Sequence, residues 1–388
     1  MNAFALVNAR VFDGWRLTEP ATVVVENGLI ASGAARGERI DARGAVLLPG
    51  LIDGHVHVRS ARARDALARH GVTTGLDMAS WPPELSASLR GAPGTADLRS
   101  AGLPAIGPEG PHARLLVKEP EAVVTDAREA EGWVAARIAE GADYVKIIME
   151  APGGGGLEAG VAKAIVDAAH ARGRRVVAHA ASAGAYTMAV DSGADVITHC
   201  PRGAAADPAD VTRMRAEGRV AVPTLVMMQG LARFFGAQGA DGAHGAHGAH
   251  GAHGAHGAHG AGGAQRASGA PGGFAGSTAT VAALHAAGVP VLAGTDANDE
   301  PGVPFQVEHG ASLHQGLRLL VEAGLGPAEA LRAATSLPAR HFSLGDRGSV
   351  EPGRRADLVL IDGDPLAGIT ATEHVLRVWC AGVEHLAA

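Results

Sequence analysis

From about residue 47 onward, short apolar runs rich in β-branched residues alternate with alanine-rich windows of helical periodicity. Repeating strand–helix units over about 290 residues indicate a parallel sheet with crossover helices. We count about eight such strands, which predicts an α/β fold of the (β/α)8 TIM-barrel type. Strand candidates that follow the first one are residues 72–76, 143–149, 175–179, 195–199, 220–224 and 289–296.

The helical windows lie between these runs. They cover residues 61–70, 126–140, 158–172 and 183–193, and Asp126 is a candidate N-cap for the second of them. Residues 307–342 add two helices, the second of which is expected from about Pro327 to Arg340 because proline is favourable in a first helical turn.

Both ends of the chain read as short strands separated by turn-forming residues. Because each end alone buries little surface, we expect the two to combine into one small β-sandwich. The predicted domains are therefore residues 1–48 (N-terminal part of the sandwich), 49–345 (barrel) and 346–388 (C-terminal part of the sandwich).

The predicted barrel is interrupted by a Gly/Ala/His-rich insert at residues 236–276, in which Ala-His-Gly occurs six times in succession over residues 243–260. Such a composition forms no core, so the insert is expected to be disordered. One interpretation is a repeat expansion in a loop, and the other is a metal-recruiting arm at the C-terminal face of the barrel. A metal-storage or metal-delivery protein that uses this tract is the hypothesis from a different functional class.

Composition excludes some functions. A formal net charge of −7 gives no overall attraction to nucleic acid or to an anionic membrane. There is no signal-peptide pattern and no long apolar run typical of a transmembrane helix. Only two cysteines occur, which suits a reducing compartment. We therefore expect a cytoplasmic protein with a small-molecule substrate.

Polar residues of types that bind metals each fall at the C-terminal end of a predicted parallel strand. His55 and His57 follow an apolar run and, two residues apart in a strand, share one face. Each residue has a less specific explanation: surface or capping histidines, a lysine whose head reaches water, an aspartate that caps a helix. Placed around one barrel mouth, however, they form a ligand set suited to Zn²⁺ or Mn²⁺. The other members of the set are Lys146, His179, His199 and Asp296.

The order of these residues resembles the amidohydrolase superfamily in its binuclear-metal form. More narrowly, the chain is similar to the imidazolonepropionase-like and prolidase-like branch over nearly its whole length outside the insert. The flanking phrases that carry the resemblance are Pro-Gly-Leu-Ile-Asp-Gly-His-Val-His at residues 49–57, Gly-Thr-Asp-Ala at 294–297, Ala-Leu-Arg-Ala-Ala-Thr at 330–335 and Gly-Arg-Arg-Ala-Asp-Leu-Val-Leu at 353–360.

The resemblance implies two divalent metal ions. Zn²⁺ is the expected metal, and Mn²⁺ is the alternative. His55, His57 and Asp296 would bind one ion, and His179 and His199 the other. Lys146, carboxylated by CO₂, would bridge both. A hydroxide held between the ions would attack a carbonyl, and Asp296 would accept the proton and pass it to the leaving amine. Asp296 and Lys146 are thus the catalytic candidates, and relatives of this branch imply a homo-oligomer.

The substrate is less well specified. The Gly-Gly-His-Gly loop common near this branch is replaced by Gly-Pro-Glu-Gly-Pro-His at residues 107–112, and the loop after His199 also differs. Arg59 and Arg202 are candidates to pair with a substrate carboxylate, although surface arginines are commonly solvated. The residues that we expect to contact substrate are Arg59, His112, Arg202, Asn298 and His309.

The expected activity is hydrolysis of an amide, peptide-like or cyclic amide C–N bond other than in ordinary proteolysis, with a dipeptidase-like or prolidase-like enzyme as one form. A lactonase or phosphotriesterase on the same centre is one alternative. A mononuclear deaminase is another, although such a site has no use for a bridging Lys146.

Overall fold

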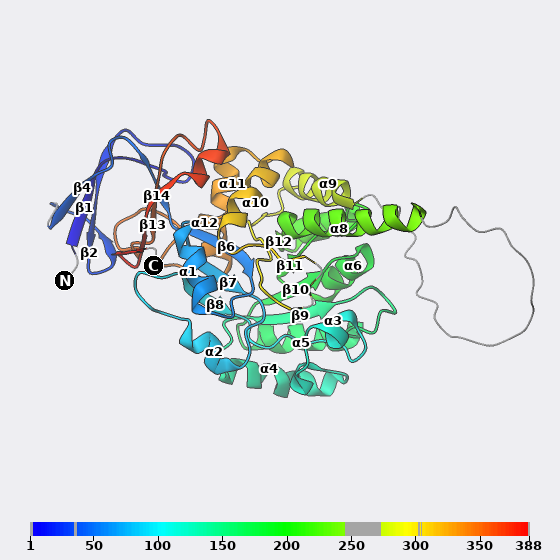
Figure 1. The fold of residues 1–388 in the computed structure, drawn as a ribbon. Coiled ribbons are helices and arrows are strands. Elements are labelled where there is room, and N and C mark those ends of the chain that lie inside the picture. The colour runs from blue at the N-terminus through cyan, green and yellow to red at the C-terminus, as the bar shows by residue number, and fades with distance from the viewer. Residues whose placement is uncertain (1–2, 35–36, 245–272, 302, 304, 387–388) are drawn as a thin grey trace, which may run out of the picture.

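The computed structural model describes residues 3–34, 37–244, 273–301, 303 and 305–386. A barrel-like body is flanked by a sheet that contains both ends of the described chain (Figure 1). Within the described ranges, no helix has both the length and the apolar character needed to cross a membrane.

The end sheet has eight strands, in the order β15-β14-β13-β5-β1-β2-β3, with β4 paired to β1. Apolar side chains from both chain ends share one core here, in which the Phe4 and Trp379 rings stack with centroids 5.6 Å apart. The two ends therefore stabilise each other, as the sequence predicted. The strands are β1 (Ala3–Val11), β2 (Ala21–Glu26), β3 (Leu29–Ala31), β4 (Glu38–Asp41), β5 (Val46–Pro49), β13 (Leu358–Ile361), β14 (Val375–Cys380) and β15 (Val383–Glu384).

Seven parallel strands build the body, in the two sheets β6-β7-β8 and β12-β11-β10-β9. They are buried almost throughout, as expected of strands covered on both faces. Their bounds are β6 (Leu51–Val56), β7 (Val72–Asp77), β8 (Asp97–Ser100), β9 (Val145–Met149), β10 (Val176–Ala180), β11 (Val196–Thr198) and β12 (Val220–Val222).

Isolated bridges connect the two sheets into a ring. Ala105 bridges to Ile147 on one side. On the other side, the last predicted strand, at residues 289–296, is not a regular strand. It still connects the two sheets, because Val291 forms a bridge with Ala221 of β12, and Ala297, the residue that follows this segment, forms one with Val56 of β6. Gly54 allows this close approach, since a Cβ there would lie 2.6 Å from the Ala293 carbonyl oxygen. The arrangement agrees with the predicted (β/α)8 architecture.

Helices follow the strands as predicted, and Asp126 caps the start of the 127–139 segment by accepting a hydrogen bond from the Arg128 N–H. The helices are α1 (Ala61–Arg69), α2 (Pro83–Ser88), α3 (Pro111–Leu115), η1 (Pro120–Ala122), η2 (Ala127–Glu129), α4 (Ala130–Ala139), α5 (Ala159–Ala171), α6 (Ala183–Ser192), α7 (Pro208–Ala216), α8 (Leu225–His244), α9 (Gly273–Ala286), α10 (Ala311–Glu322), α11 (Pro327–Ala333), α12 (Ser336–His341) and η3 (Ile369–Glu373).

Two helix predictions need correction. Residues 307–342 hold three helices rather than two, because the chain leaves helical geometry at Thr335, where φ is −137°. The predicted disordered insert is wrong at its margins: α8 continues through residue 244 and α9 begins at residue 273. Alanine is the strongest helix former, and it offsets the glycines there. The rest of the insert, including all but the first copy of the Ala-His-Gly repeat, lies outside the described residues.

A buried ion cluster joins the body to the end sheet. Arg347, which follows α12, donates to Asp97 of β8 and to Thr74 of β7, each at 2.9 Å. Asp357, one residue before β13, lies 3.9 Å from Arg347 and 3.2 Å from Arg355. Because the Asp357 carbonyl also accepts the Gly50 N–H, the cluster fixes the junction from which β6 departs.

Candidate metal centre and active-site pocket

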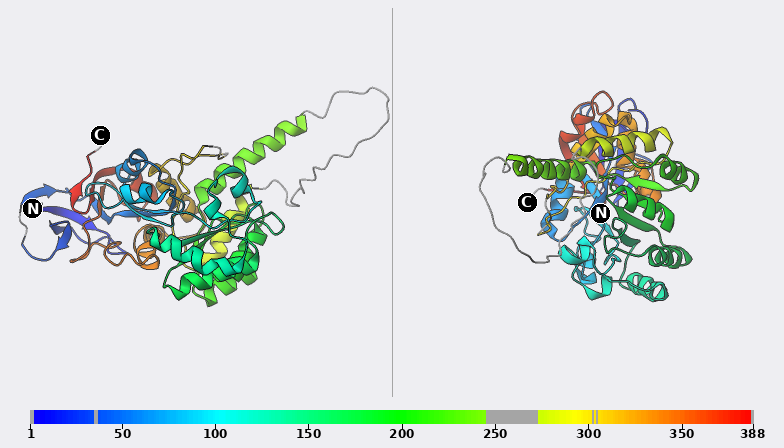
Figure 2. Two further views of the ribbon diagram at one scale, coloured as in Figure 1. Left: turned by 90° about the horizontal axis from the view of Figure 1, so that it is seen from below. Right: turned by 90° about the vertical axis from the view of Figure 1, so that its right-hand side faces the viewer.

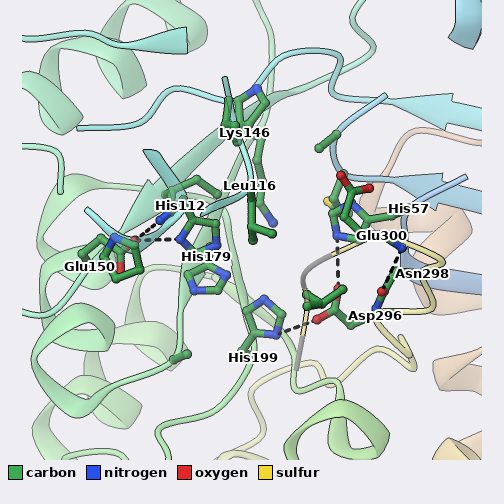
Figure 3. A pocket seen from close by; sticks show the side chains of 18 of the residues that line it. His57, His112, Leu116, Lys146, Glu150, His179, His199, Asp296, Asn298 and Glu300 are labelled. Atoms are coloured by element: carbon green, nitrogen blue, oxygen red, sulfur yellow. Dashed lines mark hydrogen bonds and ion pairs between the residues drawn. The ribbon is translucent and has the colours of Figure 1, made fainter. Parts of the chain in front are cut away.

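All six predicted metal ligands line one cavity of about 640 Å³ (Figure 3). They come from five separate segments: the end of β6, β9, β10, the turn after β11, and the turn at the end of residues 289–296. Segments that lie far apart in the sequence thus bring these side chains to one place. The predicted ligands are His55, His57, Lys146, His179, His199 and Asp296.

His55, His57 and Asp296 form the tightest group. The Asp296 Oδ1 lies 3.2 Å from His55 Nε2 and 3.1 Å from His57 Nε2. The two ring nitrogens are 3.4 Å apart. One oxygen and two imidazole nitrogens around a common point are a donor set for a divalent cation such as Zn²⁺.

His179 and His199 extend this group towards β9 and β10. Their ring centroids are 4.4 Å apart, and the His199 ring lies 4.9 Å from that of His55. His199 Nδ1 is also 3.9 Å from Asp296 Oδ2. Asp296 therefore lies between His55 and His57 on one side and His199 on the other.

Lys146 lies deeper along its strand than the sequence predicted. It is the second residue of β9 and pairs in register with Val177, two residues before His179, so it does not end its strand. Its side chain lines the cavity because a lysine is long enough to span the roughly 7 Å rise of two strand residues. Its Nζ is buried and, in the described part of the chain, has no hydrogen-bond partner.

A buried lysine without a partner is costly, and burial lowers the pKa of Lys146 to about 7. Near neutral pH a substantial fraction of the side chain is therefore a neutral amine. This is the form that can attack CO₂, and the resulting carbamate is an anionic oxygen ligand.

Among the other candidate ligands, all except His57 have pKa shifts that suit a cation. Burial would lower the pKa of His57, but the contact with Asp296 outweighs it and raises that pKa. Burial alone would raise the pKa of Asp296, but the His55 and His57 contacts outweigh it and hold that pKa well below its usual range. Burial lowers the pKa of His55 to about 3 and holds the pKa of His179 and His199 well below the ordinary value. Neutral imidazoles around an ionised carboxylate are ready to bind a metal.

Left-handed backbone geometry turns three site residues out of their strands. His199, Thr224 and Asp296 have φ of +72°, +45° and +62°. Residues other than glycine seldom adopt this region, and such strain persists where the surroundings enforce it. Here His199 and Asp296 line the cavity, whereas the Thr224 side chain is buried against His199.

Sequence reasoning missed two threonines that orient the histidines. The Thr198 Oγ1 lies 2.5 Å from His55 Nδ1, and the Thr224 Oγ1 lies 2.7 Å from His199 Nδ1. Both hydroxyls are fully buried. Thr224 follows β12, the neighbour of the strand β11 that His199 follows, whereas Thr198 ends β11 and reaches His55 of β6, which lies in the other sheet. Only the tertiary structure reveals these two pairings.

We expect Thr224→Val to weaken zinc binding about 10- to 100-fold, the usual cost of losing a partner that orients a metal ligand. Valine keeps the shape of threonine but cannot hold the His199 ring. Zinc affinity, measured by competition with a chelator, checks this expectation. Thr212→Val is the matched control, because its exposed hydroxyl only donates to Pro208; equal affinities in the two variants would contradict the assigned role.

Four of the five predicted substrate contacts line the cavity: Arg59, His112, Arg202 and Asn298. His309 is not among the lining residues. Its Nε2 lies 2.9 Å from the His57 carbonyl oxygen. His309 therefore contacts the backbone of a candidate ligand, and its role as a substrate contact stays a prediction.

Most charged groups in the cavity are already paired. Arg59 donates to both carboxylate oxygens of Glu300 at 2.8 Å. The His112 Nδ1 lies 2.6 Å from Glu150 Oε1, and Glu150 carried no signal in the sequence (Figure 3). Burial would raise the pKa of Glu150, but the hydrogen bond with His112 outweighs it and lowers that pKa. His112 is thereby held with its ring 4.6 Å from that of His179.

Comparison with known proteins agrees with this site. The model of the "Amidohydrolase family" matches residues 46–384. An uncharacterized protein of Mycobacterium tuberculosis is 30% identical over 373 residues, which cover 90% of this chain and 88% of that protein.

Solved structures share the whole fold. A prolidase complexed with N-methylphosphonate-L-proline has a TM-score of 0.76 at 23% identity. A Xaa-Pro dipeptidase with methionine bound in its active site has a TM-score of 0.75 at 22% identity. Both comparisons cover 99% of each chain, and at these identities they establish the fold alone.

Proposed function

This chain belongs to the amidohydrolase family, and from that premise we propose that it is a metal-dependent hydrolase of an amide or cyclic amide C–N bond in a small molecule. The observation that carries the proposal is the convergence of four histidines, Asp296 and the unpartnered amine of Lys146 on one cavity. The family typically uses divalent metals, and the donor set fits them.

We assign His55, His57 and Asp296 to one ion and His179 and His199 to a second. Lys146, after attack of its neutral amine on CO₂ and loss of one proton, would supply a carbamate oxygen to each. When bound, two such metal ions supply a Lewis acid and lower the pKa of a water molecule.

The residues of the chain then have distinct tasks. Asp296 accepts a proton from the attacking water, since its depressed pKa keeps it ionised and its two oxygens lie beside His55, His57 and His199. It returns the proton to the departing nitrogen, so that water and amide become a carboxylic acid and an amine. Thr198 and Thr224 hold the rings of His55 and His199 in place.

The proposal is tested by metal stoichiometry together with a substrate panel. The protein is purified with bicarbonate and zinc, and its zinc content is measured by elemental analysis. A matched variant replaces the six histidines of the Ala-His-Gly tract with glutamine, so that stray metal there does not inflate the count. We expect about two ions per chain in the variant, and hydrolysis that a chelator abolishes and zinc restores.

The panel contains N-acyl amino acids, cyclic amides, a lactone, a phosphotriester and adenine. Amide hydrolysis well above the other reactions is the expected result. About one ion per chain with release of ammonia from adenine would replace the proposal with a mononuclear deaminase. Activity that survives complete metal removal would reject both.

A further inference from the structure

We propose that the substrate of this site carries an extended apolar substituent, a straight alkyl chain or an aryl group, which binds along one face of α8. The inference deepens the proposed function and relies on it only for the identity of the bond that is cleaved. The binding of the apolar substituent can be measured without any turnover.

The helix α8 starts at the metal centre. Its first residue, Leu225, directly follows Thr224, whose hydroxyl lies 2.7 Å from the Nδ1 of the candidate ligand His199. From this point α8 runs outward and projects from the body of the molecule (Figure 2). A substrate whose reacting group lies at the candidate metal centre therefore has room to place a substituent along the first turns of α8.

Three apolar side chains form a stripe on the pocket side of α8. Met227, Leu231 and Phe235 are spaced by four residues, so they share one face of the helix, and all three line the cavity. Exposure increases along the stripe: Met227 is 4% exposed, whereas Phe235 is 46% exposed. The stripe thus leads from the buried end of the cavity to its mouth over about 12 Å, at 1.5 Å per helical residue.

Other lining residues are also apolar. Leu116 (Figure 3) and Val117, which follow α3, line the same cavity, as does Trp81. Leu115 beside them is 67% exposed, so apolar surface continues to the outside at this rim. An exposed apolar surface next to a ligand cavity is typical of a binding site for an apolar group.

Charge in the cavity favours a neutral substituent. Arg59 is paired with Glu300, and His112 is paired with Glu150. The Lys118 ammonium donates to the Arg114 carbonyl oxygen. Arg202 packs over the Phe235 ring, 5.5 Å from its centroid, and so covers the outer end of the stripe. A charged substituent would have to compete with these contacts, whereas an alkyl or aryl group would not.

The test measures binding of 2-pentanone, 2-heptanone and 2-nonanone to the zinc-loaded full-length protein by calorimetry. These ketones present a carbonyl to the centre but have no C–N bond to cleave, so a failure of the proposed hydrolysis does not affect the result. We expect affinity to rise roughly three- to fourfold for each added methylene. We also expect 8-oxononanoate, which carries a terminal carboxylate, to bind no more tightly than 2-nonanone.

Substitutions on α8 test whether the alkyl chain of the ketone binds along this helix. Leu231→Asn should lower the affinity for 2-nonanone at least tenfold and leave that for 2-pentanone unchanged, which also shows that the fold is intact. Phe235→Ala should lower the affinity for 2-nonanone only. Phe234→Ala is the matched control, because this neighbouring phenylalanine contacts the Phe235 ring but does not line the cavity.

Three results would overturn the inference: affinity that does not depend on chain length, tighter binding of 8-oxononanoate than of 2-nonanone, or equal effects of Phe234→Ala and Phe235→Ala. If length dependence appears but no amide is hydrolysed in the substrate panel, the proposed function fails while the apolar subsite stands.

Discussion

Lys146→Ala is expected to reduce amide hydrolysis about 10³-fold, as the loss of several kcal/mol of metal-derived stabilisation implies. The same change should lower the zinc content from about two ions per chain to about one. The physical reason is that His55, His57 and Asp296 still form a three-ligand site, whereas His179 and His199 lose the anionic ligand that they would share with it.

Chemical rescue distinguishes a carboxylated Lys146 from a bare one. In the Lys146→Ala protein, added propionate can place a carboxylate where the carbamate would stand, and it should restore part of the activity and the second ion. Propylamine, which mimics the unmodified side chain, should not. Restoration by propylamine rather than propionate would contradict the bridging role and leave Lys146 as a simple amine.

Lys163→Ala is the matched control for this experiment. Lys163 is 60% exposed and pairs with Asp167 on the surface of α5, far from the cavity lining. Its removal should leave both zinc content and activity unchanged. Loading the unaltered protein without bicarbonate provides a second comparison, since only a carboxylated Lys146 requires CO₂ for assembly of the centre.

Arg347→Met is expected to destabilise the protein by about 3–5 kcal/mol, the usual result of removing one partner from a buried ion pair. Methionine fills most of the space of arginine but leaves Asp97 and Asp357 with less compensation for their burial. The Arg347 and Asp97 side chains are only 2% and 4% exposed, so water cannot replace the lost contacts.

The free energy of unfolding, obtained from urea denaturation, measures this effect. Arg128→Met is the control, because Arg128 is 90% exposed and its ion pair with Asp126, which is open to water, should contribute little to stability. Adding Asp97→Asn to Arg347→Met should recover part of the loss, as the two residues are in direct contact. Equal destabilisation by the Arg347 and Arg128 variants would show that the cluster does not clamp the end sheet to the body.

The position of the ligands could be predicted because each depends on a local pattern. His55 and His57 share a face by simple alternation along a strand. His199 follows and Asp296 ends an apolar run that was predicted to be a parallel strand, although the run at 289–296 is not a regular one. Parallel strands in a barrel end at the same mouth, so the sequence was sufficient to bring these residues together. The end sheet was predictable for a similar reason, since neither chain end buries enough surface alone.

Other features depend on contacts between segments that no sequence pattern couples. The Glu150–His112 pair joins β9 to the start of α3, and the Thr224–His199 pair joins the ends of two adjacent strands. His309 was expected to contact substrate, but its ring lies against the His57 carbonyl oxygen. In each case the side chain's direction was set by packing.

The sequence by itself determined the order of strands and helices, the candidate ligand set and the union of the two chain ends, because periodicity and residue type act over short distances along the chain. Only the tertiary structure decided the depth of Lys146 within β9, the Arg347 cluster and the apolar stripe of α8 beside the candidate metal centre. These depend on which surfaces meet when the ring closes, and that is fixed by the packing of the whole molecule rather than by any one segment.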